Sequence, residues 1–180
     1  MKVHVAAALM AVSLVLCACS PQAKDDPSAS PSAPASTSSS VAVSVAPSPS
    51  DSPAAQSVVA YWAAIDRAAA DPSVRLDTLA DVASDEALSQ WQVMLNQNRG
   101  KGFRQIGASV VTVTKIEPKA GADGQWNVTA CVDVSDVDVV DESGDSVVSA
   151  DRPDRVDYEH VVARRDGRLY VTESKAVGEC

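Results

Sequence analysis

The sequence has few aromatic residues and few histidines. Three Trp, three Tyr and one Phe make up 4% of the chain, and all of them lie after residue 60, which excludes a well-packed core before that point. Only one of the two histidines, His160, lies outside the apolar leader, which excludes a zinc site built on a histidine pair and a relay through several imidazoles. The sequence also lacks a Gly-rich phosphate-binding loop and a Gly-x-Ser-x-Gly nucleophile motif, so neither kind of site is expected.

Long apolar runs are also scarce, and the one extended run stands at the start of the chain. It covers residues 3–16, which is too short for a permanent membrane helix but has the length of a signal-peptide core. The cleaving peptidase needs a small residue before its cut, and Ala18 meets this need, whereas a cut before Cys17 would place Leu16 there. We therefore predict a signal peptide over residues 1–18. The alternatives are an ordinary secreted protein and an uncleaved anchor.

The motif LCAC at residues 16–19 resembles the lipobox of bacterial lipoproteins. The resemblance implies that Cys19 becomes the first residue and carries palmitate-type acyl chains, while Cys17 leaves with the signal peptide. Two acyl chains anchor a protein stably, so we expect the chain at the extracytoplasmic face of the cell membrane. Of the four cysteines, Cys131 and Cys180 then remain as an even pair, and we expect them to form a disulfide in an oxidising compartment.

A tether is predicted over residues 19–53, which are mostly Ser, Ala and Pro. Such a segment cannot bury enough apolar surface to offset the entropy of ordering, so it should be disordered. If flexible, it would average about 30 to 35 Å from end to end, which is enough to clear the lipid head groups. Residues 54–180 have the length of one ordinary domain.

The predicted domain is acidic. The whole chain has 15 Lys and Arg against 24 Asp and Glu, and beyond residue 53 the balance is about minus eight. This surplus of negative charge argues against binding to nucleic acid and against adhesion to an anionic lipid surface.

Three helices are predicted at the start of this domain. The first begins at the N-cap Ser52, with Pro53 in its first turn, and its apolar stripe continues until Asp71 and the proline that follows it. A second, shorter helix comes directly afterwards. The third begins after the N-cap Ser84, has acidic residues in its first turn and ends at Arg99 and the following glycine.

Alternating apolar residues predict strands over residues 106–116, 126–134, 156–165 and 169–175. In the first of these, we expect one face to be formed by Ile106, Ala108, Val110, Thr112, Thr114 and Ile116. Asp-Gly and Ser-Gly pairs between the strands predict tight turns. Helices followed by hairpins indicate an α+β fold in which the N-terminal helices pack on one face of an antiparallel sheet.

Two details concern the strand that contains Cys131. In "VDVSDVDVV" the alternation slips by one residue at Ser135 and Asp136, which predicts a β-bulge or a strand break that bends the sheet. Cys131 lies on the face opposite to Val128, so the disulfide to Cys180 is expected on the outer side or the edge of the sheet.

A helical first third over a bent antiparallel sheet resembles the NTF2-like, cone-shaped fold. The whole chain resembles small actinobacterial lipoproteins with such a domain, on the stretches "YWAAIDRAAADPSVRLDTLADVASDEALSQWQ", "RGKGFRQIG", "ACVDVSDVDVVDESG" and "GEC". The resemblance implies the fold, the lipid on Cys19 and the pairing of Cys131 with Cys180, but it brings no catalytic motif. NTF2-like domains include isomerases, dehydratases and envelope assembly modules, so the fold alone does not select a function.

Four polar residues are candidates for a pocket on the concave side of the sheet. Tyr158 and His160 share one face of their strand, and they would meet Tyr61 and Asp66 of the first helix in a small polar pocket suited to proton transfer. The alternative is a hydrogen-bonded His and Tyr at the rim of the core.

Two charged clusters are candidate binding sites. Six acidic residues invite calcium, but they alternate with valines as solvent-facing strand residues do, so we predict no metal and no other cofactor: Asp133, Asp136, Asp138, Asp141, Glu142 and Asp145. Three arginines flank a turn and are expected to balance nearby carboxylates, the alternative being contact with an anionic wall polymer: Arg164, Arg165 and Arg168.

These observations favour a non-enzymatic binding or assembly module of the cell envelope, held at the membrane by its lipid. The expected partner is an envelope protein or a wall component, and nucleic acid is not expected. The alternative is a small-ligand binder or isomerase-like enzyme that uses the concave pocket, with Asp66, Tyr158 and His160 as its working residues.

Overall fold

The computed structural model describes residues 51–180. The predicted signal peptide, the predicted lipidation site Cys19 and nearly all of the predicted tether, residues 19–53, lie outside the described residues. The first helix starts at Pro53, one residue before the predicted start of the domain. No helix within residues 51–180 is both long enough and apolar enough to cross a bilayer.

The first helix, α1, covers Pro53–Ala70 and confirms the prediction from its ends. The Ser52 hydroxyl accepts a hydrogen bond from the amide of Ala55 at 3.1 Å, so Ser52 is the N-cap. Asp71 lies at the other end in extended backbone, because the residue that precedes a proline disfavours helical geometry.

The other two helices also lie where they were predicted. A short 3₁₀ helix, η2, covers Leu76–Asp81, and α2 covers Asp85–Gly100. Ser84 stands at the N-cap position of α2, but its hydroxyl donates to the Asp85 carboxylate and does not cap the helix. Strand β6 (Arg168–Glu179) fixes this helix start, because the Ser84 amide donates to the Val171 carbonyl.

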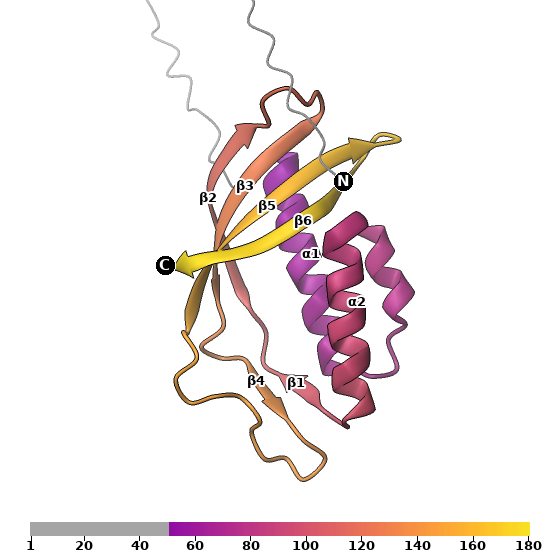
Figure 1. The fold of residues 1–180 in the computed structure, drawn as a ribbon, viewed down its shortest axis with the longest axis vertical. Coiled ribbons are helices and arrows are strands. Elements are labelled where there is room, and N and C mark those ends of the chain that lie inside the picture. The colour runs from indigo at the N-terminus through magenta and orange to yellow at the C-terminus, as the bar shows by residue number, and fades with distance from the viewer. Residues whose placement is uncertain (1–50) are drawn as a thin grey trace, which may run out of the picture. The chain divides into compact units, whose positions relative to one another are not determined.

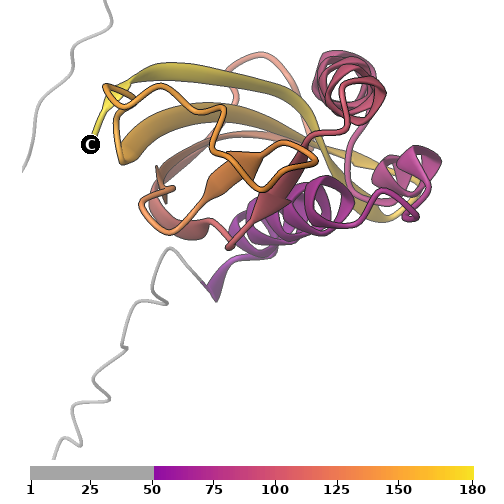
Figure 2. The ribbon, with the colours of Figure 1, turned by 90° about the horizontal axis from the view of Figure 1, so that it is seen from below.

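The main sheet has four antiparallel strands in the order β2-β3-β5-β6. Strands β2 (Val110–Pro118), β3 (Gln125–Asp133) and β5 (Arg155–Arg165) precede β6 in the chain. A second sheet pairs β1 (Arg104–Ile106) with β4 (Asp138–Val140). Figures 1 and 2 show α1 along one face of the curved main sheet, with the β1–β4 pair at one end. The fold is the predicted α+β arrangement, with N-terminal helices packed on a bent antiparallel sheet.

The prediction of one continuous strand over residues 106–116 was wrong. The chain leaves β1 at Gly107, which has a φ of 76° and lies so near the Asp136 carbonyl that a Cβ would be 1.8 Å from its oxygen. The expected face was also wrong up to Val113, because Val111 and Val113 pack against the core whereas Val110 is 60% exposed, and it holds at Ile116, which packs against the core. Pairing with β3, which includes a register shift after Val113, decides which side faces inward.

The predicted strand break at Ser135 and Asp136 is confirmed. Strand β3 ends at Asp133, whose carboxylate accepts hydrogen bonds from the amide and the hydroxyl of Ser135. The chain then turns and resumes as β4 in the second sheet. The break therefore moves the valines of β4 out of the main sheet and into the second sheet, where β4 pairs with β1.

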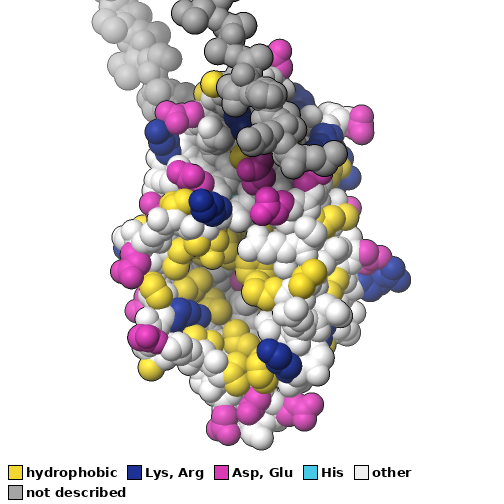
Figure 3. All heavy atoms as spheres, viewed as in Figure 1, with side chains coloured by type: hydrophobic (Ala, Val, Ile, Leu, Met, Phe, Trp, Pro, Cys, Tyr) yellow, Lys and Arg dark blue, Asp and Glu magenta, His cyan; other side chains and the backbone are white. Residues whose placement is uncertain are grey.

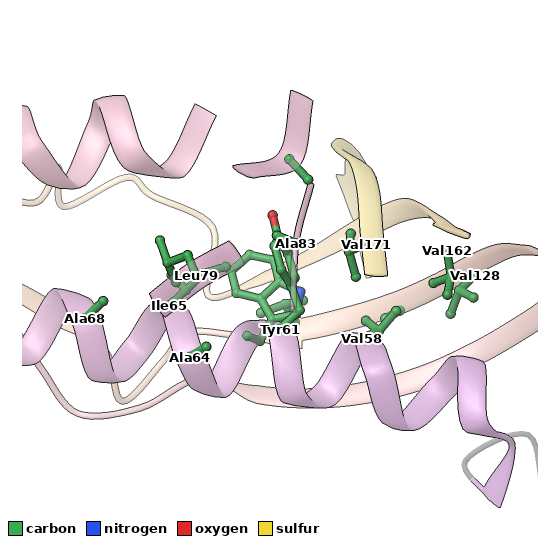
Figure 4. Packing of buried hydrophobic residues seen from close by; sticks show 14 of the residues in the cluster. Val58, Tyr61, Ala64, Ile65, Ala68, Leu79, Ala83, Val128, Val162 and Val171 are labelled. Carbon is green, nitrogen blue, oxygen red and sulfur yellow. The ribbon is translucent and has the colours of Figure 1, made fainter. Parts of the chain in front are cut away.

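The core lies between α1 and the concave face of the main sheet (Figure 4). Val58, Tyr61 and Ile65 of α1 are each at most 1% exposed. From the sheet side they meet Val128 of β3 and Val162 of β5, together with neighbouring small residues. Burial of this apolar surface is the main force that holds the helix on the sheet.

The predicted disulfide between Cys131 and Cys180 is present, with 5.9 Å between the Cα atoms. Cys131 alternates in β3 with Ala130 and Val132, which belong to the core, so its side chain lies on the outer face as predicted. The bond ties the end of β6, an edge strand, to the central strand β3 across β5.

Two of the three arginines at the β5–β6 turn pair with carboxylates, as predicted. Arg165 forms an ion pair with Asp85, and Arg168 forms one with Asp81. The Arg164 guanidinium lies over the Trp126 ring, 5.6 Å from its centroid. The two ion pairs hold the turn against η2 and α2.

Candidate ligand cavity

A cavity of about 400 Å³ opens between the two α-helices and the β1–β4 pair. Its walls come from α1, α2, β1, the segment after β3, β4 and the beginning of β5. Figure 3 shows hydrophobic side chains gathered in a hollow on this face, with Lys and Arg side chains beside it. The volume falls within the usual range of small-molecule sites.

Apolar side chains form most of the cavity wall. Trp91 and Met94 of α2, Val137 and Val139, and Phe103 from the connection between α2 and β1 all line the cavity. The ring centroids of Trp91 and Trp62 are 5.6 Å apart, so the wall continues directly into the aromatic part of the core. The cavity can therefore desolvate an apolar ligand.

Asp66 is the one carboxylate of the cavity wall, and it is already engaged. One oxygen accepts a hydrogen bond from the Gln105 amide at 2.8 Å. The other accepts from the amide and the hydroxyl of Ser109, at 2.9 and 2.7 Å. Asp66 thus holds β1 and the start of β2 against α1, and its role in the structure is to position this wall.

Three arginines also line the cavity. One terminal nitrogen of Arg99 donates to the carbonyls of Ala68 and Asp71, which joins the ends of α1 and α2. One terminal nitrogen of Arg152 donates to two carbonyls that flank the strand break, at 2.9 and 2.8 Å. Arg104 is exposed and forms no ion pair within residues 51–180.

The four predicted pocket residues divide between the cavity and the core. Asp66 and Tyr158 line the cavity, whereas Tyr61 and His160 are each 1% exposed and belong to the packed interior. Tyr158 and His160 are stacked with their ring centroids 5.9 Å apart, and Tyr61 meets His160 edge to face. Asp66 is bonded to Gln105 and Ser109 instead of to this aromatic group.

The environment of His160 is that of a structural histidine. The Trp62 indole donates to its Nε2 at 3.4 Å, which assigns the neutral ring the Nδ1–H tautomer. Burial lowers the pKa of His160 to about 4 and raises the pKa values of Tyr61 and Tyr158. At neutral pH these three groups are therefore uncharged. His160 is hydrogen-bonded to Trp62 inside the core, and within residues 51–180 no hydrogen bond joins it to Tyr61 or Tyr158.

Sequence reasoning did not single out the three cavity arginines or Gln105 and Ser109. Arg99, Arg104 and Gln105 all fall in "RGKGFRQIG", a stretch that combines three cations with glycines between a helix and a strand. That density of charge was the available signal. Arg152 gave none, because it joins the site only through the path of the chain after β3.

The acidic residues around β4 bind neighbouring groups of the chain itself. Asp138 accepts from the Val139 amide and the Ser146 hydroxyl, and Asp141 accepts from the amides of Ser143 and Asp145. In the part of the chain that the structure describes, no three His, Cys, Asp or Glu side chains are grouped so that they could hold a metal ion.

Comparison with known proteins indicates a family for this domain. Residues 55–169 match the model of the family described as ARC6-like, IMS domain. The intermembrane space region of chloroplast protein ARC6 has a similar structure, with a TM-score of 0.54 and 16% identity over 69% of this chain and 95% of that chain. Aln2 from a Streptomyces species gives a TM-score of 0.47 and 13% identity over 73% of this chain and 93% of that chain. No curated protein shows significant similarity in sequence.

Proposed function

Because the chain belongs to the ARC6-like, IMS domain family, we propose that it is a lipid-anchored, extracytoplasmic binding or assembly module of the cell envelope, and not an enzyme. Its NTF2-like domain binds an envelope protein or a wall component in the concave cavity. The family description names an intermembrane-space domain, and a domain that works beside a membrane is what the lipobox-like motif at residues 16–19 also favours.

The observation that carries the binding role is the chemistry of the cavity wall. Aromatic and aliphatic side chains from α2 and β4 form an open apolar surface, which favours burial of a ligand or a partner side chain. Proton-transfer chemistry has little support in the same place. His160 is buried behind the wall, and the Asp66 carboxylate accepts three hydrogen bonds from the protein itself.

Asp66 and Tyr158 both line the cavity, and this favours a second candidate function. A small-ligand binder or isomerase-like enzyme would use them on a bound molecule. Native mass spectrometry of the purified protein separates the two functions. A retained small molecule that the protein converts chemically would support the enzyme, whereas a ligand released unchanged supports the binding module.

The anchor is tested by metabolic labelling with an alkyne-tagged fatty acid. We expect Cys19→Ser to abolish the label and Cys17→Ser to leave it, because only Cys19 is proposed to remain in the mature chain. Labelled Cys19→Ser protein would contradict the proposal.

The binding surface is tested with a photo-crosslinking amino acid at two neighbouring positions of α2. Met94 lines the cavity and is 37% exposed, whereas Val93 is 57% exposed and does not line it. In intact cells we expect position 94 to give a defined crosslink that position 93 does not give. Identical crosslinks at both positions, or none at either, would refute a partner in the cavity.

A further inference from the structure

We infer that the cavity binds an amphiphile with an apolar chain or ring and a single anionic head group, a carboxylate or a phosphate. This inference rests on the proposed binding function of the cavity and names the class of ligand. It also places the ligand's charge against the arginines that line the cavity.

The charge of the cavity wall is opposite to that of the domain. Arg99, Arg104 and Arg152 line the cavity together with a single carboxylate, Asp66. The domain as a whole carries about eight excess negative charges by its Lys, Arg, Asp and Glu content. Asp66 accepts its hydrogen bonds from Gln105 and Ser109 and forms no ion pair with an arginine within residues 51–180, so the wall keeps an excess of positive charge.

The arginines also keep hydrogen-bond donors that the protein does not use. In Arg99 one terminal nitrogen donates to carbonyls of α1 and its C-cap, while the Nε is buried and has no partner within residues 51–180. In Arg152 one terminal nitrogen is bound to the strand break. Arg104, the most accessible of the three, has a guanidinium fork that is free within residues 51–180, and this fork matches the two oxygens of a carboxylate or phosphate.

The bound arginines have a further consequence for affinity. Because backbone carbonyls already hold Arg99 and Arg152 in place, an anionic head group that meets them does not have to order two long side chains. The apolar part of the same ligand would lie along Trp91, Met94 and Phe103. The cavity therefore presents both halves of an amphiphile site on rigid elements.

A titration with matched ligands tests this inference. The protein is residues 19–180 with Cys19→Ser, exported so that Cys131 and Cys180 can oxidise, and Trp91 in the cavity wall serves as the fluorescent reporter. The probes are dodecanoate, dodecyl phosphate, dodecanol and dodecylamine, each below its micelle concentration. We expect binding of the two anions, binding of the alcohol that is at least tenfold weaker, and no binding of the amine.

Variants locate the head group. Arg104→Gln should weaken dodecanoate binding about tenfold. This is the lower end of the affinity loss expected when a hydrogen bond to a charged group near solvent is removed, about tenfold or more. The substitution should leave dodecanol binding unchanged. Arg67→Gln is the matched control, because Arg67 is exposed on α1, does not line the cavity and removes the same charge. Met94→Glu should abolish binding of every probe.

The outcomes separate the two proposals. Equal affinity for dodecanoate and dodecanol, or equal effects of Arg104→Gln and Arg67→Gln, would overturn the anionic head group while the cavity remains a binding site. A second possible result is that the protein binds none of the amphiphiles but still crosslinks to a partner polypeptide through position 94. This result would also overturn the ligand class and leave the binding module intact. Absence of both amphiphile binding and crosslinks would refute the proposed function itself. Preference between dodecanoate and dodecyl phosphate assigns the head group.

Discussion

The buried histidine should make the fold sensitive to mild acid. His160 is 1% exposed, and burial lowers its pKa from 6.5 to about 4. The His160 Nε2 accepts a hydrogen bond from the Trp62 indole N–H. A second proton on the ring would turn Nε2 into a donor, and two donors would then face each other. The folded state therefore resists protonation, while His160 in the unfolded chain takes up a proton with its ordinary pKa.

The sign and the size of the effect follow from linkage. Because the folded pKa is below the unfolded one, the stabilising contribution of neutral His160 is present above pH 6.5 and is lost as the pH falls toward 4. Each unit of pKa difference is worth about 1.4 kcal/mol, so the full loss is about 3 kcal/mol. At pH 5 the free energy of unfolding should have fallen by about 2 kcal/mol from its value at pH 8.

This window is separate from that of the surface carboxylates. Five exposed aspartates have pKa values lowered below 3.8 by hydrogen bonds to neighbouring side chains and backbone, so their contributions are lost only in stronger acid: Asp71, Asp77, Asp85, Asp133 and Asp151. A decline between pH 6.5 and 4.5 can therefore be assigned to the histidine. His160 is the one histidine of residues 19–180, which also simplifies its detection by NMR.

Urea unfolding followed by tryptophan fluorescence at pH 8, 6, 5 and 4.5 measures the effect. His160→Gln is the matched variant, because the glutamine oxygen can still accept from the Trp62 indole but does not titrate. We expect the variant to lose less than about 0.5 kcal/mol between pH 8 and pH 5. A wild-type curve that is flat over this range, or an equal decline in both proteins, would show that the burial of His160 does not govern its pKa.

Two further predictions concern the cross-link and the cavity wall. Reduction of the Cys131–Cys180 bond, which spans 49 positions, should lower the free energy of unfolding by about 4 kcal/mol in the chain-entropy account. Urea unfolding with and without reductant measures this difference, and a loss below about 1 kcal/mol would contradict the prediction. Asp66→Asn should lower the free energy of unfolding by about 1 to 3 kcal/mol, because the new amide nitrogen would face a donor of Gln105 or Ser109. The control Asp123→Asn, at an exposed position, should change the free energy of unfolding by less than about 0.5 kcal/mol. Equal effects of the two substitutions would refute the positioning role of Asp66.

The sequence alone predicted the helices, the strand break and the disulfide, because each depends on short-range signals or on a very small number of options. Ser52 with Pro53 starts α1, and the prolyl residue after Asp71 ends it, through backbone geometry within a few residues. The slip of alternation near Ser135 required a break in the strand. Only Cys131 and Cys180 were left to pair once the leader was set aside.

The tertiary structure alone decided which side of β2 faces the core and where the cavity lies. Valines stand at positions 110, 111 and 113, so local alternation does not fix the inward face, and the pairing with β3 does. Asp66 and Tyr158 line the cavity, whereas His160 does not, because its ring is stacked against Tyr158 inside the core. Arg99, Arg104 and Arg152 come from three separate segments, and only the packing of α2 and β1 beside the turn after β3 brings their charges to one cavity.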